Sequence, residues 1–490
     1  MRKLISKLPS SARARKVEPT LAPDAARNKQ GQTQPVNRAP DDGDSNTGNA
    51  YPMTELESDV VVQSVDTRHD STAGRAQSPS PCPTTLETLP AELRLHILLS
   101  LSDIDDLKAV LNASPVLYQQ YRLDRRQVLG RVLETMLTTT VFVEAYAVQA
   151  STAIYTRGSK RPQRIIVTQF LDDYRDFRSN PGDAALRQCT TEDLQSMVAF
   201  HLDVVQPLAE YYPALFLKSL DIKTQPVVGD LSSTERTRFL RSLYRFQLFC
   251  NLFGEEGPPD GPPDGPPDGF GEEEVLDWFF SIFRPWEAEE MACIARSTKA
   301  RYDDIFNAIQ WDLHRDNPRF KDWDWPLSPP GAFHLDEDDK RDDYCEGTMI
   351  RGLKLFLQAL RVDDHENLVQ LMQANIAWPV GVSLSECLSA DVQYFYMRGI
   401  ARQGPSNPHY QAALERELRL PFSGDREDAP PLAWVILWGG TYSSWFGSAI
   451  PSGLQDWGCV FWDANRLVTM GGKDAVLHER DNWTDPRRDH

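Results

Sequence analysis

The segment Leu86–Leu107 constrains this 490-residue chain more than any other, because it predicts a short apolar helix after a long polar stretch. Pro90 stands at a first helical position, and Leu93, Ile97 and Leu101 follow at four-residue spacing, which predicts one apolar stripe. So short a helix is not stable alone in water. It therefore either belongs to a small helical domain or docks on another protein.

Two more helix starts follow within a few residues. Ser102 and Asp105 resemble a capping box, and Ser114-Pro115 places a cap before a first helical position. We therefore expect a three-helix unit over 85–122, followed by a longer helix whose apolar face runs from Leu129 to Leu137.

The rest of the chain is expected to be mainly α. Helices are predicted to begin near Thr191, at Ser232 or Ser233, and at Pro285, and Gly254 is placed to end one of them. The resulting division is a disordered tail at 1–84, the three-helix unit at 85–122, a mostly helical domain at 123–471 with loops at 254–272 and 326–345, and a polar tail at 472–490.

Two stretches inside the helical domain have unusual composition. Gly257–Gly269 repeats Gly-Pro-Pro-Asp, which predicts an extended surface loop, and the mostly acidic run Asp336–Asp343 predicts a solvated loop.

The C-terminal region holds half of the chain's tryptophans. Val435–Leu437 and Gly458–Trp462 predict strands joined to the helices as a small β element, with Gly439-Gly440 as a turn. The tryptophans fit either a recognition pocket or, the favoured interpretation, a buried core.

Charge and cysteine spacing exclude several classes of function. A net charge of -19 and a pI near 5.0 disfavour a nucleic-acid partner, and seven scattered cysteines without a Cys-x-x-Cys pair disfavour a disulfide framework or a zinc site. A reducing compartment, cytoplasm or nucleus, is expected.

Two targeting patterns are weighed and set aside. Ala429–Gln455 carries no charge, but prolines and glycines interrupt it and its apolar run is too short for a membrane span. The basic, serine-containing start resembles a mitochondrial transit peptide, although Pro9 breaks its amphipathic pattern, so a disordered basic tail is favoured.

The three-helix unit resembles the F-box. The resemblance is carried by Leu89-Pro90-x-Glu92-Leu93, then Ile97-Leu98, Leu101 and Asp106-Leu107, in the order and spacing of that family. The family often has Cys or Ser, a basic residue and an aromatic near its third helix; here Ser114 is followed by Pro115 and Val116 instead. The whole chain also resembles large fungal F-box proteins of unassigned substrate in the stretches 244–254 and 457–463.

The resemblance implies a non-enzymatic subunit of a cullin–RING ubiquitin ligase. Its helices would bind the Skp adaptor on the cullin scaffold, and the helical domain would hold an unknown protein client. The residues it implies for adaptor contact are Leu89, Pro90, Leu93, Ile97, Leu98, Leu101 and Leu107. The alternative is a helical interaction scaffold, unrelated to ubiquitination, in which the same leucines are internal core.

Other polar residues suggest weaker hypotheses. Arg238, Arg241 and Arg245 share a helix face and could grip an acidic client segment, although a solvated face paired with carboxylates is the favoured interpretation. His201 is expected in the core or at its boundary. Glu287, Glu289 and Glu290 suit a helix start without a catalytic role. No catalytic, metal-binding or cofactor motif is found, so no enzyme, metal or cofactor is predicted.

Overall fold

A computed structural model describes residues 85–154, 164–180, 186, 188–220, 230–254, 270–321, 329–379, 381–403 and 408–489. Over these residues the fold is mainly α, as predicted, and contains no sheet; one isolated antiparallel bridge joins Arg419 and Thr441. The predicted tail at 1–84 and the repeat Gly257–Gly269 lie outside the described residues.

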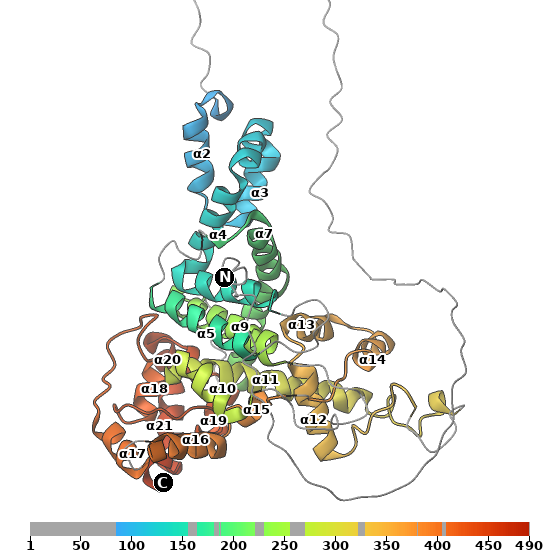
Figure 1. Ribbon diagram of the computed structural model, residues 1–490, viewed down its shortest axis with the longest axis vertical. Helices are drawn as coiled ribbons and strands as arrows, with labels where there is room; N and C mark the ends of the chain where they lie inside the picture. Colours follow the sequence, from blue (N-terminus) through green and yellow to red (C-terminus); the bar gives the residue numbers. More distant parts are fainter. Residues whose placement is uncertain are drawn as a thin grey trace, which may run out of the picture. The chain divides into compact units, whose positions relative to one another are not determined.

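The helices fall into three consecutive stretches of the chain (Figure 1). The first holds η1 (Leu86–Thr88), α2 (Ala91–Leu99), α3 (Ile104–Ala113) and α4 (Pro115–Ser151). The second holds α5 (Arg164–Ser179), α7 (Thr191–Phe200), the π-helix η2 (His201–Val205), α8 (Gln206–Ser219), α9 (Ser233–Phe253), α10 (Glu272–Trp278), η3 (Phe280–Ile282) and α11 (Pro285–Ile309).

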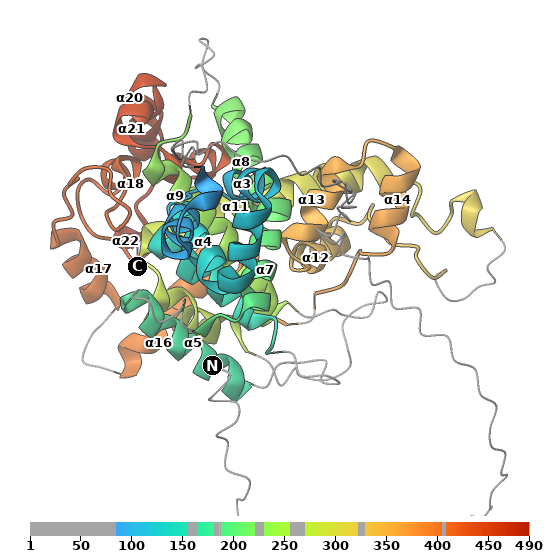
Figure 2. The ribbon, with the colours of Figure 1, turned by 90° about the horizontal axis from the view of Figure 1, so that it is seen from above.

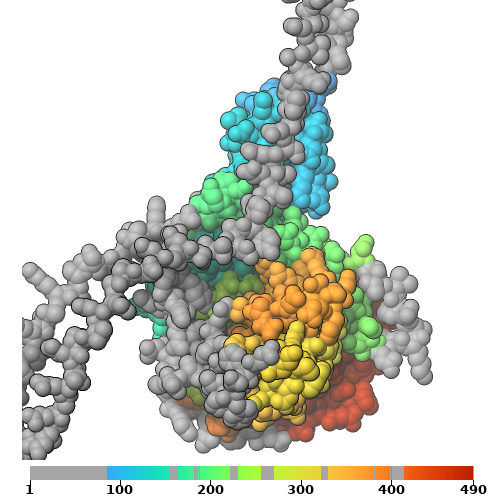
Figure 3. Space-filling model, turned by 90° about the vertical axis from the view of Figure 1, so that its right-hand side faces the viewer, coloured from blue at the N-terminus to red at the C-terminus, as the bar shows by residue number. Residues whose placement is uncertain are grey.

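The third stretch consists of shorter helices. It holds η4 (Pro318–Phe320), α12 (Asp338–Met349), α13 (Leu353–Arg361), α14 (His365–Gln373), α15 (Leu384–Cys387), α16 (Ala390–Gln403), α17 (Pro408–Glu417), α18 (Leu432–Leu437), η5 (Gly447–Ala449), α19 (Ser452–Asp456), η6 (Cys459–Phe461), α20 (Ala464–Thr469), α21 (Gly472–Asn482) and α22 (Pro486–Asp489). The yellow and orange atoms of Figure 3 belong to the part of the chain that includes α12–α14.

Local capping explains why the long helices begin where they do. Ser232 and Glu235 form a capping box at the start of α9, and the backbone N–H of Gly254 closes the other end on the Cys250 carbonyl. Pro285 occupies the first turn of α11, where its missing N–H leaves no helical bond unmade. The predicted start and end of α9 and the predicted start of α11 are confirmed.

The first three helices differ from prediction in their limits. Asp103, rather than Ser102, caps α3, because its carboxylate accepts a bond from the Asp105 N–H. Ser114 caps α4 as predicted, and the helical stretch α4 continues to Ser151 with non-helical backbone at Asp124 and Thr138. The predicted boundary at 122–123 falls inside α4, beside a kink at Asp124.

Helices α4, α9 and α11 lie at the centre of the described fold, with α9 in contact with both of the others (Figure 2). Their apolar faces join one core that extends from Leu98 to Val476. Aromatic stacking ties α9 to the C-terminal helices, since the rings of Phe239 and Phe461 are parallel with centroids 4.1 Å apart.

The predicted β element is wrong. Val435–Leu437 belongs to α18, and Cys459–Phe461 forms the 3₁₀-helix η6. Short apolar runs do not distinguish a buried strand from a buried helix, because every face of either one is apolar. Gly439 and Gly440 do form a turn, with φ of +62° and +74°, but it ends α18.

Two predicted irregular segments are helical instead. The acidic run Asp336–Asp343 enters α12, and Asp338 and Asp339 lie in its first turn. Carboxylates stabilise a helix there because they face the positive end of the helix dipole. The predicted polar tail forms α21 and α22. Arg487 of α22 is buried. It donates to the Tyr442 carbonyl and lies over the Trp438 ring, and these two contacts hold the C-terminal segment against the rest of the protein.

Thr138 interrupts α4 with φ +62° and ψ +160°, and no other described non-glycine residue has a positive φ. A β-branched residue is strained there, and the Thr138 hydroxyl is buried without a partner. Thr138→Gly is therefore expected to raise the free energy of unfolding by about 1 kcal/mol, measured by urea denaturation.

The matched control is Thr135→Gly, three residues earlier in regular helix. It should lower the free energy of unfolding by roughly 1 kcal/mol, because glycine gains no relief there and loses chain entropy. If Thr138→Gly destabilised the protein as much as Thr135→Gly, the strain at Thr138 would be disproved.

Candidate functional site

Helix α2 presents one face to the core and another to solvent. Pro90 caps it in an extended conformation, and Leu98 is fully buried while Leu95 and Leu99 pack partly against the core. Leu98 lies one residue past the stripe predicted from Leu93 and Ile97, so the buried face is turned by about 100° from that stripe. Leu93 and Ile97 of the stripe are thereby left facing outward, whereas Leu101, past the end of α2, packs partly against the core.

Polar contacts fasten this part of the chain to α4. Ser114 donates to the Glu87 carboxylate at 2.8 Å, and Arg94 donates to both the Glu87 carbonyl and the Gln120 side chain. The Gln120 amide in turn donates to Asp124 at 2.6 Å. These bonds and the Leu98 anchor hold α2 in place without using its outward stripe.

The seven leucine, isoleucine and proline side chains predicted for adaptor contact separate into two groups. Leu98 and Leu107 are 0% and 2% exposed, so they are core residues in this structure, and Leu101 packs partly against the same core. The other four, Leu89, Pro90, Leu93 and Ile97, are exposed or half-exposed and lie outside the core; we call them the α2 edge.

Exposed apolar side chains are frequent in the N-terminal helices that carry the α2 edge. Of the ten large hydrophobic side chains that are exposed among the described residues, four belong to residues 86–123: Leu86, Leu93, Tyr118 and Leu123. This segment forms part of the blue surface at the top of Figure 3. Single exposed leucines are ordinary, whereas several on one small unit indicate a contact surface.

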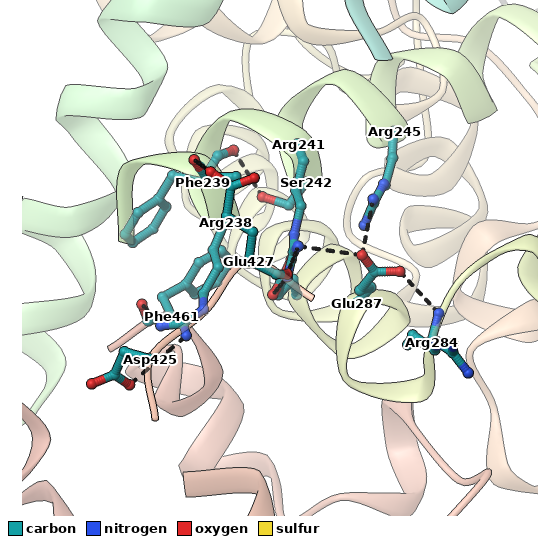
Figure 4. A network of polar contacts seen from close by, with 12 residues as sticks. Arg238, Phe239, Arg241, Ser242, Arg245, Arg284, Glu287, Asp425, Glu427 and Phe461 are labelled. Atoms are coloured by element: carbon teal, nitrogen blue, oxygen red, sulfur yellow. Dashed lines mark hydrogen bonds and ion pairs between the residues drawn. The ribbon is translucent and has the colours of Figure 1, made fainter. Parts of the chain in front are cut away.

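The predicted arginine surface is wrong. Arg238, Arg241 and Arg245 lie on one face of α9 as expected, but they are 0%, 1% and 0% exposed. Figure 4 shows them pointing into the protein toward carboxylates. They are therefore paired, as the favoured interpretation held, but within the core, and they cannot reach a client.

Glu144 of α4 and Glu287 of α11 organise this buried network. Glu144 accepts from the Arg245 guanidinium at 2.8 Å and from the Tyr174 hydroxyl. Glu287 lies within 3.3 Å of guanidinium nitrogens of Arg178, Arg241 and Arg245. Burial opposes ionisation of Glu287, but Arg245, Arg241 and Arg178 outweigh it and hold its pKa well below the ordinary value.

The network continues into the C-terminal segment. Arg241 makes a two-pronged pair with Glu290 and donates to the Glu427 carbonyl at 2.7 Å. Arg238 pairs with Asp463 at 2.9 Å and donates to the Phe461 carbonyl. The network thus joins α4, α5, α9, α11 and the C-terminal segment, which is a structural role rather than a site for an incoming ligand.

Sequence reasoning missed the acidic half of this network. Glu144 is a single charge inside the apolar run Val141–Val148, a pattern that marks a buried carboxylate needing a cation. Glu287 and Glu290 were assigned only to the helix dipole, which is correct for Glu287 as a capping residue but omits its ion pairs.

His201 and the C-terminal tryptophans lie in the core, as the favoured interpretations predict. His201 is fully buried with Nδ1 3.0 Å from the Tyr244 hydroxyl, and burial lowers its pKa to about 4. Five of the six C-terminal tryptophans are buried, which confirms a core rather than a pocket: Trp434, Trp438, Trp445, Trp457 and Trp462. The six described cysteines are buried.

The described residues contain no group of three or more side chains that could hold a metal ion, and no helix with the length and apolar character needed to cross a bilayer. Comparison with protein-family models, with curated proteins and with solved structures found no match.

Proposed function

We propose that the chain is a substrate-recruiting F-box subunit that binds the Skp adaptor of a cullin–RING ubiquitin ligase through the α2 edge. The observation that carries this proposal is that Leu89, Pro90, Leu93 and Ile97 face outward while Leu98 anchors the same helix from behind. A partner could cover this edge without unfolding the helix that presents it.

Burial of apolar surface supplies the affinity in this proposal. An apolar face on a fixed helix loses little conformational freedom when a partner groove covers it, because Arg94, Gln120 and Ser114 already hold the helix. Leu98 and Leu107, which the resemblance also implied, act as the core beneath the contact surface rather than as contacts.

The mechanism is positional. The α2 edge would fix the chain to the Skp–cullin scaffold, and the helical body would hold a protein client so that its lysines meet the charged ubiquitin-conjugating enzyme. Proximity and orientation supply the rate gain, and no residue of this chain acts as a nucleophile. Cytoplasm or nucleus is the compartment this role requires.

The arginines of α9 are not the surface that binds the client. Because Arg238, Arg241 and Arg245 are sealed in ion pairs, the client contact has to use residues on the surface of the body. No acidic or phosphorylated client is therefore inferred from them.

A helical interaction scaffold without a ubiquitin ligase is the second candidate. It is favoured by the burial of Leu98 and Leu107, which make the three N-terminal helices part of the same core as the body. Under this hypothesis the α2 edge contacts a different protein.

Affinity purification of the tagged full-length chain, followed by mass spectrometry, tests the proposal. We expect Skp and the cullin among the bound proteins, in nearly equal molar amounts. Their absence, with other partners present, would reject the ligase role in favour of the scaffold.

A further inference from the structure

Helix α11 carries three buried glutamates, and one of them has no cation beside it. Glu287 and Glu290 pair with arginines of α9. Glu289, fully buried between them, points instead toward the C-terminal segment, where its oxygens meet only neutral donors. A buried carboxyl without a cation is costly to ionise, so it is an exception that calls for an explanation.

The contacts of Glu289 come from two C-terminal elements. Its Oε2 accepts from the Gly447 N–H at 2.7 Å in η5, and its Oε1 accepts from the Gln455 amide at 2.8 Å in α19. The Gln455 amide also donates to the Gly447 carbonyl, so one carboxyl organises both elements. Gly447 has φ +64°, and a Cβ there would collide with the Leu388 carbonyl, which fixes this close approach.

The titratable groups around Glu289 offer no compensating positive charge. Cys293 and Glu290 neighbour it on α11, and Cys459 faces it from η6. At the surface, Arg296 of α11 pairs with Asp456 of α19. Burial therefore raises the pKa of Glu289 to about 8, and the donors Gln455, Gly447 and Cys293 offset only part of that rise.

We propose that Glu289 is a pH-sensitive latch: its protonated carboxyl, with Cys293 Sγ 3.8 Å from Oε1 to accept the O–H, docks the segment Gly447–Phe461 on α11, and opening of that contact releases the proton to solvent. The latch does not depend on adaptor binding, since it lies in the body of the chain. It would make docking of the C-terminal helices responsive to pH around neutrality.

The sign of the response follows from the two states of the carboxyl. When the contact opens, Glu289 regains water and its ordinary pKa of about 4.3, whereas in the closed contact the pKa is about 8. The free energy that favours the closed contact therefore has its full value below about pH 4.3. Between the two values the opening constant rises about tenfold per pH unit, and above about pH 8 it levels off.

Hydrogen exchange of the full chain, corrected for intrinsic exchange rates, measures this opening. Between pH 5.5 and 7.5 the protection of amides in Gly447–Phe461 is expected to fall about tenfold per pH unit, while amides of α13 in the same sample stay constant. Equal pH dependence in the two segments would overturn the proposal, and this comparison needs no variant.

Two substitutions sharpen the test. Glu289→Gln cannot ionise, so it should abolish the pH dependence in Gly447–Phe461, while its NH2 group, which faces a donor, lowers protection there equally at every pH. Glu273→Gln, at an exposed position of α10, should leave it unchanged. A Glu289→Gln protein that folds and keeps the wild-type pH dependence would overturn the latch.

Discussion

Replacing Glu287 with alanine is expected to lower the free energy of unfolding by about 3–5 kcal/mol, measured by urea denaturation. Glu287 faces three guanidinium groups at once, those of the buried Arg241 and Arg245 and of the half-buried Arg178, at distances of 3.1 to 3.3 Å. Its removal leaves positive charge in the core without enough carboxylates, and nothing in the alanine side chain compensates.

The control for this prediction is an arginine–carboxylate ion pair at the surface. Arg426 and Asp428 pair at 3.0 Å with both side chains solvated, and Arg426→Ala should leave stability within the error of the measurement. A Glu287→Ala protein as stable as Arg426→Ala would mean that water reaches the network and that it is not buried as described.

Leu93→Asp is expected to weaken binding of the Skp adaptor by at least roughly thirtyfold, corresponding to about 2 kcal/mol, with the fold retained. Leu93 is 48% exposed on the α2 edge, so a carboxylate there stays hydrated in the free protein. It loses that hydration only when an apolar partner covers it. Quantitative co-purification and a thermal unfolding curve measure the two effects separately.

Leu414→Asp provides the matched control. Leu414 is also a helical leucine, in α17, and is 42% exposed, so it receives the same charge at similar exposure but away from the α2 edge. Adaptor binding should be unchanged. If Leu93→Asp unfolded the chain, the α2 edge would be part of the core and the scaffold hypothesis would gain.

The sequence predicted helices well where their ends carry local signals. The start of α9 at Ser233 and of α11 at Pro285 depend on neighbouring residues only, since a cap or a proline acts within one turn. The same locality explains the error at α3, where Asp103 and Ser102 both suit a cap and geometry selects one.

The buried ion network could not be read from the sequence for the opposite reason. Arg245 meets Glu144 across 101 positions of the chain, and nothing local to α9 indicates that its arginine face turns inward. The sequence correctly predicts that Arg238, Arg241 and Arg245 share one face of a helix. Such a face, with aromatic neighbours, is usually exposed to solvent. Only tertiary packing distinguishes the two cases.

For the seven residues predicted to contact the adaptor, the sequence does not show which lie in the core and which form the exposed α2 edge. Four-residue spacing placed Leu93 and Ile97 on one stripe, which the structure leaves outside the core. Which leucines anchor the helix depends on how α2 packs against α4, a tertiary contact that no local pattern predicts. That division makes a fixed helix with a free apolar edge possible.

Calorimetric titration of the purified Skp adaptor into the full-length chain tests the central claim most directly. The α2 edge predicts a one-to-one complex with a dissociation constant of about 1 µM or tighter and a negative heat-capacity change from apolar burial. A correctly folded chain that gives no binding heat at several temperatures would contradict the claim.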